Sequence, residues 1–318
     1  MRRSQTLSSK NTIRGFILLF ITVTIWGTAF VAQSVVTDYM GSFTFNMSRS
    51  VLGGLFLLPV IAVMQHRKSD AAKKNEQTPD SVKADRVMLL KGGVSCGICF
   101  FIASNLQQIG IEYTSVGKAG FITAMYIIFV PLFSIFLHKK AGVKLWISVV
   151  MSAIGLYFLS MAGKESFTVE KGDFLLILCA IGFTFHILVI DYFSEKVDGV
   201  KLSCAQFWTA AVLGLIITLI FEDPGWDIII RAWKPICYAG IMSCGVAYTL
   251  QILAQKDLKP TVASLIMSLE SVIAAIAGWV ILGETMSGRE IFGCALMFAA
   301  IIIAQLPEKR KTADIISK

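Results

Sequence analysis

The apolar run 260–282 contains one carboxylate, Glu270, close to its midpoint. The run is long enough to cross a bilayer, so Glu270 is predicted to lie near the membrane midplane. An ionisable group at that depth costs about 2.5–3.5 kcal/mol on insertion scales and normally faces a polar cavity or a partner. Glu270 is therefore a candidate substrate contact or proton acceptor; the alternative is a neutral carboxyl group that bonds a neighbouring helix.

Arg49 is the second intramembrane charge, seven residues into the apolar run 43–63. A helical rise of 1.5 Å per residue places it roughly 10 Å below the outer surface. Its guanidinium stays charged and needs a partner or water. It could bind an anionic substrate group or pair with Glu112 or Glu270. It could also extend back to the outer interface.

His186 lies in the run 173–191, about five residues from its cytoplasmic end. Proton coupling and simple helix packing both remain open for it. Asp191 follows five residues later, which is not the same helix face, so we expect no direct pair. Both side chains could still line one inner vestibule.

Several amides also fall inside apolar runs, where they usually form hydrogen bonds between helices. They are Gln33, Asn46, Asn105, Gln107, Gln206, Gln251 and Gln255. Gln107 and Gln251 are the better candidates for a pathway, because they occupy corresponding positions of an internal repeat described below. We expect no metal site and no cofactor, since the sequence has neither a nucleotide-binding G-x-x-x-x-G-K-[ST] motif nor H-E-x-x-H.

These residues are carried by a strongly apolar chain of 318 residues, which is 55% hydrophobic and 16% charged. Such a composition indicates a membrane protein. We predict an all-α membrane fold with ten transmembrane helices, at 15–36, 43–63, 88–111, 117–137, 144–162, 173–191, 203–221, 235–254, 260–282 and 288–306. The polar stretch 65–86 is predicted to be a mobile cytoplasmic loop.

The charge distribution predicts the orientation in the plasma membrane. When the loops are numbered alternately, 22 of the 29 basic residues fall on the side that holds the N-terminus. By the positive-inside rule both termini are expected to be cytoplasmic. The net charge of +8 is thus a signal of topology, and no nucleic-acid partner is expected.

The ten runs divide into two groups of five, predicted as repeats at 14–162 and 163–307. The pattern Arg14-Gly15-x-x-Leu-Leu recurs as Lys171-Gly172-x-x-Leu-Leu, at an offset of 157. A second offset of 144 aligns Leu106-Gln107 with Leu250-Gln251 and Tyr126 with Glu270. Because five is odd, the second repeat must be inverted relative to the first. Inverted repeats are typical of transporters whose substrate site lies near the midplane.

The chain resembles the EamA family of the drug/metabolite transporter superfamily. The residues that carry this resemblance are Trp26-Gly27-Thr28-Ala29-Phe30, Phe45-x-x-x-Arg49, 119–126 with Val130-Pro131, Tyr248-x-Leu250-Gln251-x-x-x-Gln255, Leu269-Glu270-Ser271-Val272 and Leu282-Gly283-Glu284. The resemblance implies ten helices in two inverted repeats and ATP-independent movement of small metabolites, often outward. It has two departures: Glu270 stands where many relatives carry proline, and Lys139-Lys140 stand where the second half has Gly283-Glu284.

We therefore predict a secondary transporter, not an enzyme, that exports a small metabolite by alternating access. An amino acid and an amphipathic amine are the candidate substrates, and protons are a candidate coupling ion. A homodimer is left open. The candidate pathway residues are Glu270, Tyr126, Arg49, Gln107, Gln251, His186 and Trp26. The alternatives are an intramembrane enzyme that uses Glu270 with Arg49, or a membrane sensor or scaffold.

Overall fold

A computed structural model describes residues 9–71, 79–114, 116–136, 142–160, 171–282 and 287–305. Every regular element in these ranges is a helix. Eight helical segments are long and apolar enough to cross a membrane, and two shorter apolar helices cover 143–158 and 291–303. The prediction of an all-α membrane protein is confirmed at this level.

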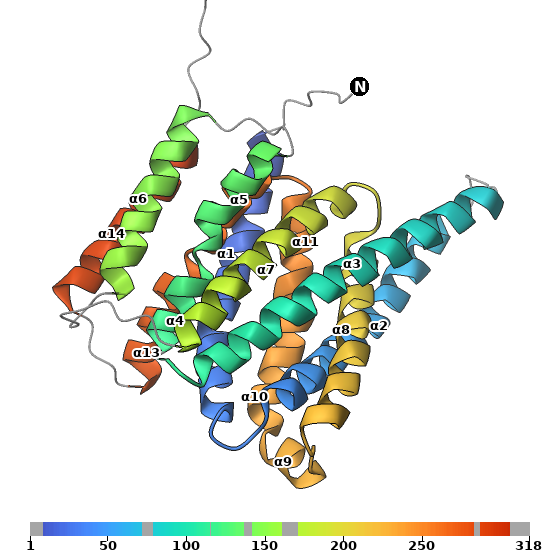
Figure 1. Cartoon of the computed structure of the whole chain (residues 1–318). Helices are drawn as coiled ribbons and strands as arrows, with labels where there is room; N and C mark the ends of the chain where they lie inside the picture. The colour runs from blue at the N-terminus through green and yellow to red at the C-terminus, as the bar shows by residue number, and fades with distance from the viewer. Residues whose placement is uncertain are drawn as a thin grey trace, which may run out of the picture.

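The helices of the first half of the chain pack on those of the second (Figure 1). The first half contains α1 (Ser9–Val36), α2 (Ser42–Ala71), α3 (Pro79–Ile111), α4 (Val116–Thr123), α5 (Tyr126–Phe136) and α6 (Val143–Ser160). The second contains α7 (Lys171–Ser194), α8 (Gly199–Phe221), α9 (Trp226–Arg231), α10 (Trp233–Cys237), the π-helix η1 (Tyr238–Ala247), α11 (Tyr248–Gln255), α12 (Pro260–Met267), α13 (Glu270–Leu282) and α14 (Gly288–Gln305).

The packing has two outer pairs and a centre. Helix α6 packs along α14 at one edge of the molecule, and α2 packs along α8 at the other (Figure 1). Between these pairs, α3 packs on α7, while η1 and α11 pack on α1. The candidate residues lie on this central group of helices and on α2, α5 and α13.

The predicted loop at 65–86 is shorter than expected. Helix α2 continues to Ala71 and α3 already begins at Pro79, so 65–71 and 79–86 are helical. Residues 72–78 lie outside the described residues. The loop prediction rested on polarity, but Lys, Gln, Glu and Arg are good helix formers, and helices can extend beyond the membrane into water.

Two spans that were predicted as continuous helices are each broken near the middle. The runs 117–137 and 260–282 are interrupted at residues 124–125 and 268–269. At each break, short bonds to the third preceding carbonyl replace the α-helical pattern. Pro131 lies inside α5, and the break comes before it.

Helix boundaries recur at fixed offsets along the chain. The starts of α2 and α8 are 157 residues apart. From the end of α3 onward the offset is 144. At this offset the end of α3 corresponds to the end of α11, the start of α4 to the start of α12, and the start of α5 to the start of α13. The offset changes between α2 and α3, where the first half has the longer connection.

Candidate functional site

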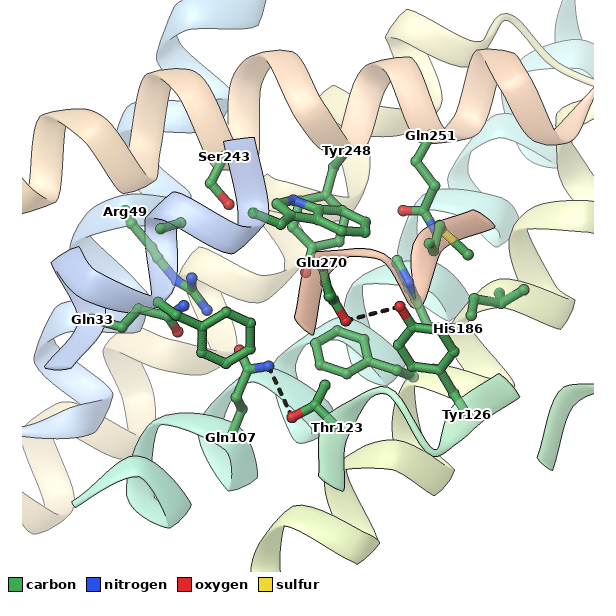
Figure 2. Close-up of a pocket in the computed structure, with 16 residues that line it drawn as sticks. Gln33, Arg49, Gln107, Thr123, Tyr126, His186, Ser243, Tyr248, Gln251 and Glu270 are labelled. Carbon is green, nitrogen blue, oxygen red and sulfur yellow. Dashed lines mark hydrogen bonds between the residues drawn. The ribbon is translucent and has the colours of Figure 1, made fainter. Parts of the chain in front are cut away.

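A small cavity lies between the central helices, and all seven candidate pathway residues line it (Figure 2). Sequence reasoning did not single out its other nine lining residues, which are Ala29, Phe30, Gln33, Thr123, Phe183, Ile187, Ser243, Tyr248 and Met267. Side chains from α1, α2, α3, α4, α5, α7, η1, α11, α12 and α13 meet there. That the seven residues form a pathway stays a prediction, but the structure places them around one space.

Glu270 and Tyr126 bond to each other across the cavity (Figure 2). The tyrosine hydroxyl donates to Oε1 of the carboxylate at 2.8 Å, and both residues are buried. Each is the first residue after its helix break, Tyr126 of α5 and Glu270 of α13. The start of a helix favours a carboxylate, because its free N–H groups and dipole are positive there. The break therefore stabilises Glu270 at a depth where a charge is costly.

Arg49 faces the same cavity from α2 and is 2% exposed. Its guanidinium carbon lies 5.5 Å from the ring centroid of Phe45 and 5.7 Å from that of Phe100. Among the described side chains it forms no ion pair within 4.0 Å, so the proposed pairs with Glu112 and Glu270 are not formed. Its burial also excludes extension to the outer interface, because ring faces hold the guanidinium inside the helix bundle.

The start of α2, which carries Arg49, is held by two carboxylates from other segments. Glu222 accepts hydrogen bonds from the backbone N–H groups of Phe43 and Thr44 at 2.9 and 2.7 Å. Glu112 accepts one from the hydroxyl of Ser42 at 2.5 Å. The Glu222 contacts satisfy N–H groups that have no partner within the helix. Glu112 thus helps to anchor the helix of Arg49 and does not neutralise the guanidinium.

His186 belongs to an aromatic wall of the cavity. Its Nε2 lies 3.0 Å from Oε1 of Gln206, and its ring packs 5.8 Å from the ring of Tyr248, centroid to centroid. Trp26 covers the other side of Tyr248 at 4.6 Å between centroids. His186 is completely buried at the central cavity. The expectation that it forms no direct pair with Asp191, and the inner vestibule suggested for these two residues, stay predictions.

The two amides chosen from the repeat also line the cavity. The amide nitrogen of Gln107 donates to the hydroxyl of Thr123 at 3.4 Å. Gln251 is 1% exposed and projects from α11 (Figure 2). The remaining amides outside the cavity bond between helices, as Asn46 does with Asn105 at 2.9 Å.

Several buried polar atoms on cavity residues have no hydrogen-bond partner among the described residues. They are Trp26 Nε1, Gln33 Oε1, Nε and Nη2 of Arg49, His186 Nδ1 and Gln251 Oε1. Each such atom costs about 1–3 kcal/mol if it stays unsatisfied. Their concentration around one space favours polar contents there.

The lining is organised in pairs at the two repeat offsets. Twelve of the sixteen lining residues form six such pairs: Trp26 with Phe183, Ala29 with His186, Phe30 with Ile187, Gln107 with Gln251, Thr123 with Met267, and Tyr126 with Glu270. The four without a lining counterpart are Gln33, Arg49, Ser243 and Tyr248. The cavity therefore lies where equivalent positions of the two halves meet.

The volume of the cavity is about 30 Å³. A buried water needs about 10–15 Å³ by this kind of measure, so there is room for roughly two waters. Ligand pockets commonly span about 300–1,000 Å³. A molecule of amino-acid size enters only if the surrounding helices move apart.

The lining residues that the sequence prediction missed differ in whether a sequence signal could have selected them. Gln33 was among the intramembrane amides, and Tyr248 was part of a family pattern, so depth and motif could have selected both. Ser243 lies in η1, a π-helix of ten residues, and no sequence signal indicated it. Such widened turns are frequent at functional sites and re-aim side chains.

Comparison with known proteins gives a consistent result. The model of a family described as the EamA-like transporter family matches residues 13–161 and 170–305. An uncharacterized transporter of Archaeoglobus fulgidus is 27% identical, with 91% of this chain and 84% of that protein covered. The uncharacterized transporter YoaV of Bacillus subtilis is 24% identical, with 88% and 92% covered.

Some of the matched relatives have a substrate in their name. The threonine/homoserine exporter RhtA of Escherichia coli is 27% identical, with 72% of this chain and 75% of that protein covered. Among solved structures, one crystal structure of a protein superposes with a TM-score of 0.72 at 18% identity, covering 93% of this chain and 96% of that one. This likeness shows that the fold is shared.

Proposed function

The chain belongs to the EamA-like transporter family of the drug/metabolite transporter superfamily, and from this premise we propose that it exports a small polar metabolite by alternating access. That it is a membrane transporter follows from the family and from the named relatives. The observation that carries the proposal is the central polar cavity lined by repeat-equivalent pairs. No ATP-binding motif is present, so a gradient drives the transport.

The proposed architecture is ten transmembrane helices in two inverted repeats, residues 14–162 and 163–307, in the cell membrane with both termini cytoplasmic. The recurring helix boundaries support it, because they relate the start of α2 to that of α8 at an offset of 157, and boundaries of α3, α4 and α5 to those of α11, α12 and α13 at an offset of 144. The two shorter apolar helices, α6 and α14, are the fifth members of the two sets and pack on each other. Transporters of this design hold the substrate at the interface of the repeats.

Two repeat-equivalent contacts are the proposed closures of the pathway. Near the predicted cytoplasmic face, Arg14 of α1 forms an ion pair with Asp257, 3.6 Å apart, in the turn after α11. At the equivalent positions on the other face, Nζ of Lys171 lies 4.7 Å from the ring centroid of Tyr113 in the turn after α3. Both contacts are formed in this structure. Opening one of them while the other stays closed would expose the cavity to one side at a time.

A glycine beside each basic residue permits these contacts. A Cβ on Gly15 would lie 2.8 Å from the side chain of Leu258, and one on Gly172 would lie 2.9 Å from the carbonyl oxygen of Gly110. At Gly172 the nearest atom is backbone and cannot shift, whereas at Gly15 a larger residue would have to displace the side chain of Leu258. The repeated Arg/Lys-Gly pattern therefore has a structural reason, which is the close approach of a helix to a turn at each end.

Glu270 is the proposed site of coupling. The carboxylate can hold either a proton or a cationic substrate group, and the two exclude each other, which is the basis of antiport. The name of the threonine/homoserine exporter supports an amino acid as substrate. Tyr126 lines the cavity and holds the carboxylate between cycles.

The test is efflux from loaded proteoliposomes with and without a pH gradient. A thermal-shift screen over amino acids, amines, nucleosides and sugars first selects the substrate. Glu270→Gln is then compared with Glu195→Gln, which changes an exposed carboxylate outside the cavity. We expect transport and its pH dependence to be lost in the first variant and kept in the second. Unchanged transport in both would remove Glu270 from the mechanism, and product formation without movement would indicate an enzyme.

A further inference from the structure

We propose that Arg49 and Glu270 form the two ends of a clamp for a zwitterion, with the substrate carboxylate on Arg49 and its ammonium group on Glu270. This inference rests on the proposed transport function and names the substrate class of the same cavity. The substrate class is an α-amino acid whose side chain contacts the aromatic wall. Neither the named relatives nor the family match assigns these two residues such a role.

The guanidinium is the anion-binding end. It is 2% exposed, lines the cavity, and has two nitrogen atoms without a hydrogen-bond partner among the described residues. A planar guanidinium with adjacent free N–H groups matches a carboxylate in a two-pronged arrangement. The rings of Phe45 and Phe100 fix the group but accept no conventional hydrogen bond. An anionic ligand group is therefore the partner that Arg49 lacks.

The carboxylate of Glu270 is the cation-binding end. Its Oε1 accepts a bond from Tyr126, and it forms no ion pair within 4.0 Å among the described side chains. An ionised carboxylate has more acceptor sites than this one bond uses. A substrate ammonium group can occupy them without displacing Tyr126. The start of α13 supports the charge from behind.

Two buried groups of opposite charge that line one cavity without pairing with each other are what select a zwitterion. Arg49 and Glu270 line one cavity and are not paired with each other. A ligand with only an amine would pair with Glu270 and leave the buried guanidinium of Arg49 unpaired. A ligand with only a carboxylate would pair with Arg49 and leave the carboxylate of Glu270 unpaired. Leaving one buried charge without its partner is strongly unfavourable. A neutral sugar or nucleoside supplies neither charge.

The remaining lining fits the rest of such a molecule. Trp26, Phe183 and Tyr248 present ring surfaces, while the unpartnered atoms of Gln33 and Gln251 offer hydrogen bonds. Substrates with hydroxylated or apolar side chains are both accommodated by this mixture. A substrate with a charged side chain would need an ionic partner in addition to Arg49 and Glu270. Among the described lining residues only a protonated His186 could provide one.

The test uses the purified full chain in nanodiscs and a series of matched probes. The first probe is L-threonine. Two analogues are matched to it: 1-amino-2-propanol lacks the carboxylate, and 3-hydroxybutyrate lacks the amine. The other standard amino acids are measured beside them. Binding is followed by calorimetry. We expect one or more amino acids to bind, with L-threonine at least about tenfold tighter than either of its one-charge analogues. This comparison needs no variant and so does not depend on the folding of a mutant.

Two variants then assign the ends of the clamp. Arg49→Gln should weaken the amino acid to the level of the amine probe, and Glu270→Gln should weaken it to the level of the acid probe. An amine that binds as tightly as the amino acid, and that Arg49→Gln leaves unchanged, would overturn the proposal. A cavity that binds amines, nucleosides or sugars but no amino acid would also overturn it, while the proposed transport function would stand.

Discussion

The two halves of this chain agree in the backbone and differ in the chemistry they bring to the cavity. Helix ends, turns and the break in a central span recur at the same offsets in both halves. At the equivalent lining positions, however, Tyr126 stands opposite Glu270 and Ala29 opposite His186. The difference indicates that the repeat supplies the shape of the site, and that departures from the repeat supply its polarity.

Arg49 shows the same division most clearly. Its counterpart at the offset of 157 is Gln206, which does not line the cavity and bonds His186 at 3.0 Å. One repeat position thus carries a cavity charge in the first half and a structural amide in the second. Substitutions that make the halves more alike should abolish function while the fold survives.

The largest effect is expected for Arg49→Gln, which gives the first half the residue of the second. Transport of the substrate should fall by about 10- to 100-fold, because a buried charge-assisted contact contributes about 1.5–3 kcal/mol. Initial efflux rates from proteoliposomes measure it. Arg231→Gln, on the exposed surface of α9, serves as the control and should transport normally. Equal rates for the two variants would mean that Arg49 only packs.

The next effect concerns the two closures. Gly172→Leu should slow transport by about tenfold or more, since its side chain meets the backbone of Gly110, which cannot move aside. Gly15→Leu should slow it less, since the atoms that it meets belong to the flexible side chain of Leu258. Gly225→Leu, where the nearest atoms lie at 3.8 Å, is the matched control. A reversed order of the first two rates would contradict the assignment of these contacts.

Tyr126→Phe should have a smaller effect, mainly on stability. It removes the hydroxyl that bonds Glu270 and leaves a buried carboxylate oxygen without this donor. We expect a loss of about 1–3 kcal/mol, measured as a lower midpoint of thermal unfolding in detergent. Added substrate should restore part of the loss, because its ammonium group occupies Glu270. If the substrate stabilises the variant no more than it stabilises the wild type, Glu270 is not its binding partner.

The smallest effect is expected at the start of α2. Glu222→Gln weakens the cap on Phe43 and Thr44 and should cost about 0.5–2 kcal/mol of stability. Substrate affinity should change little, because Arg49 is more than one helical turn away. If Glu222→Gln lowered substrate affinity strongly without changing the free energy of unfolding, the cap would be shown to control the position of Arg49 directly.

The all-α membrane fold could be predicted from the sequence, because long apolar runs are a strong signal in membrane proteins. The depth of Glu270 and the weak repeat selected seven residues that the structure places around one cavity. The breaks at 124–125 and 268–269 could not be predicted, since the sequence is apolar on both sides of each break. In the second break, the hydroxyls of Ser268 and Ser271 bond nearby backbone carbonyls and compete with the helix.

The partners of Arg49 also escaped prediction. Sequence spacing suggested ion pairs with Glu112 or Glu270, but Glu112 bonds Ser42 at the start of α2. Opposite charges at similar depth need not meet, because the ring faces of Phe45 and Phe100 hold the guanidinium away. Side-chain orientation between distant helices is set by packing, which one sequence does not specify.

The central claim is that two repeat-equivalent closures open in turn around one shared cavity. The most direct measurement is the thiol accessibility of Ser243→Cys, which lines that cavity, in a chain whose seven native cysteines are replaced. An impermeant reagent should label this position from the cytoplasmic side in Gly15→Leu and from the outer side in Gly172→Leu. Labelling from the same side in both variants would contradict it.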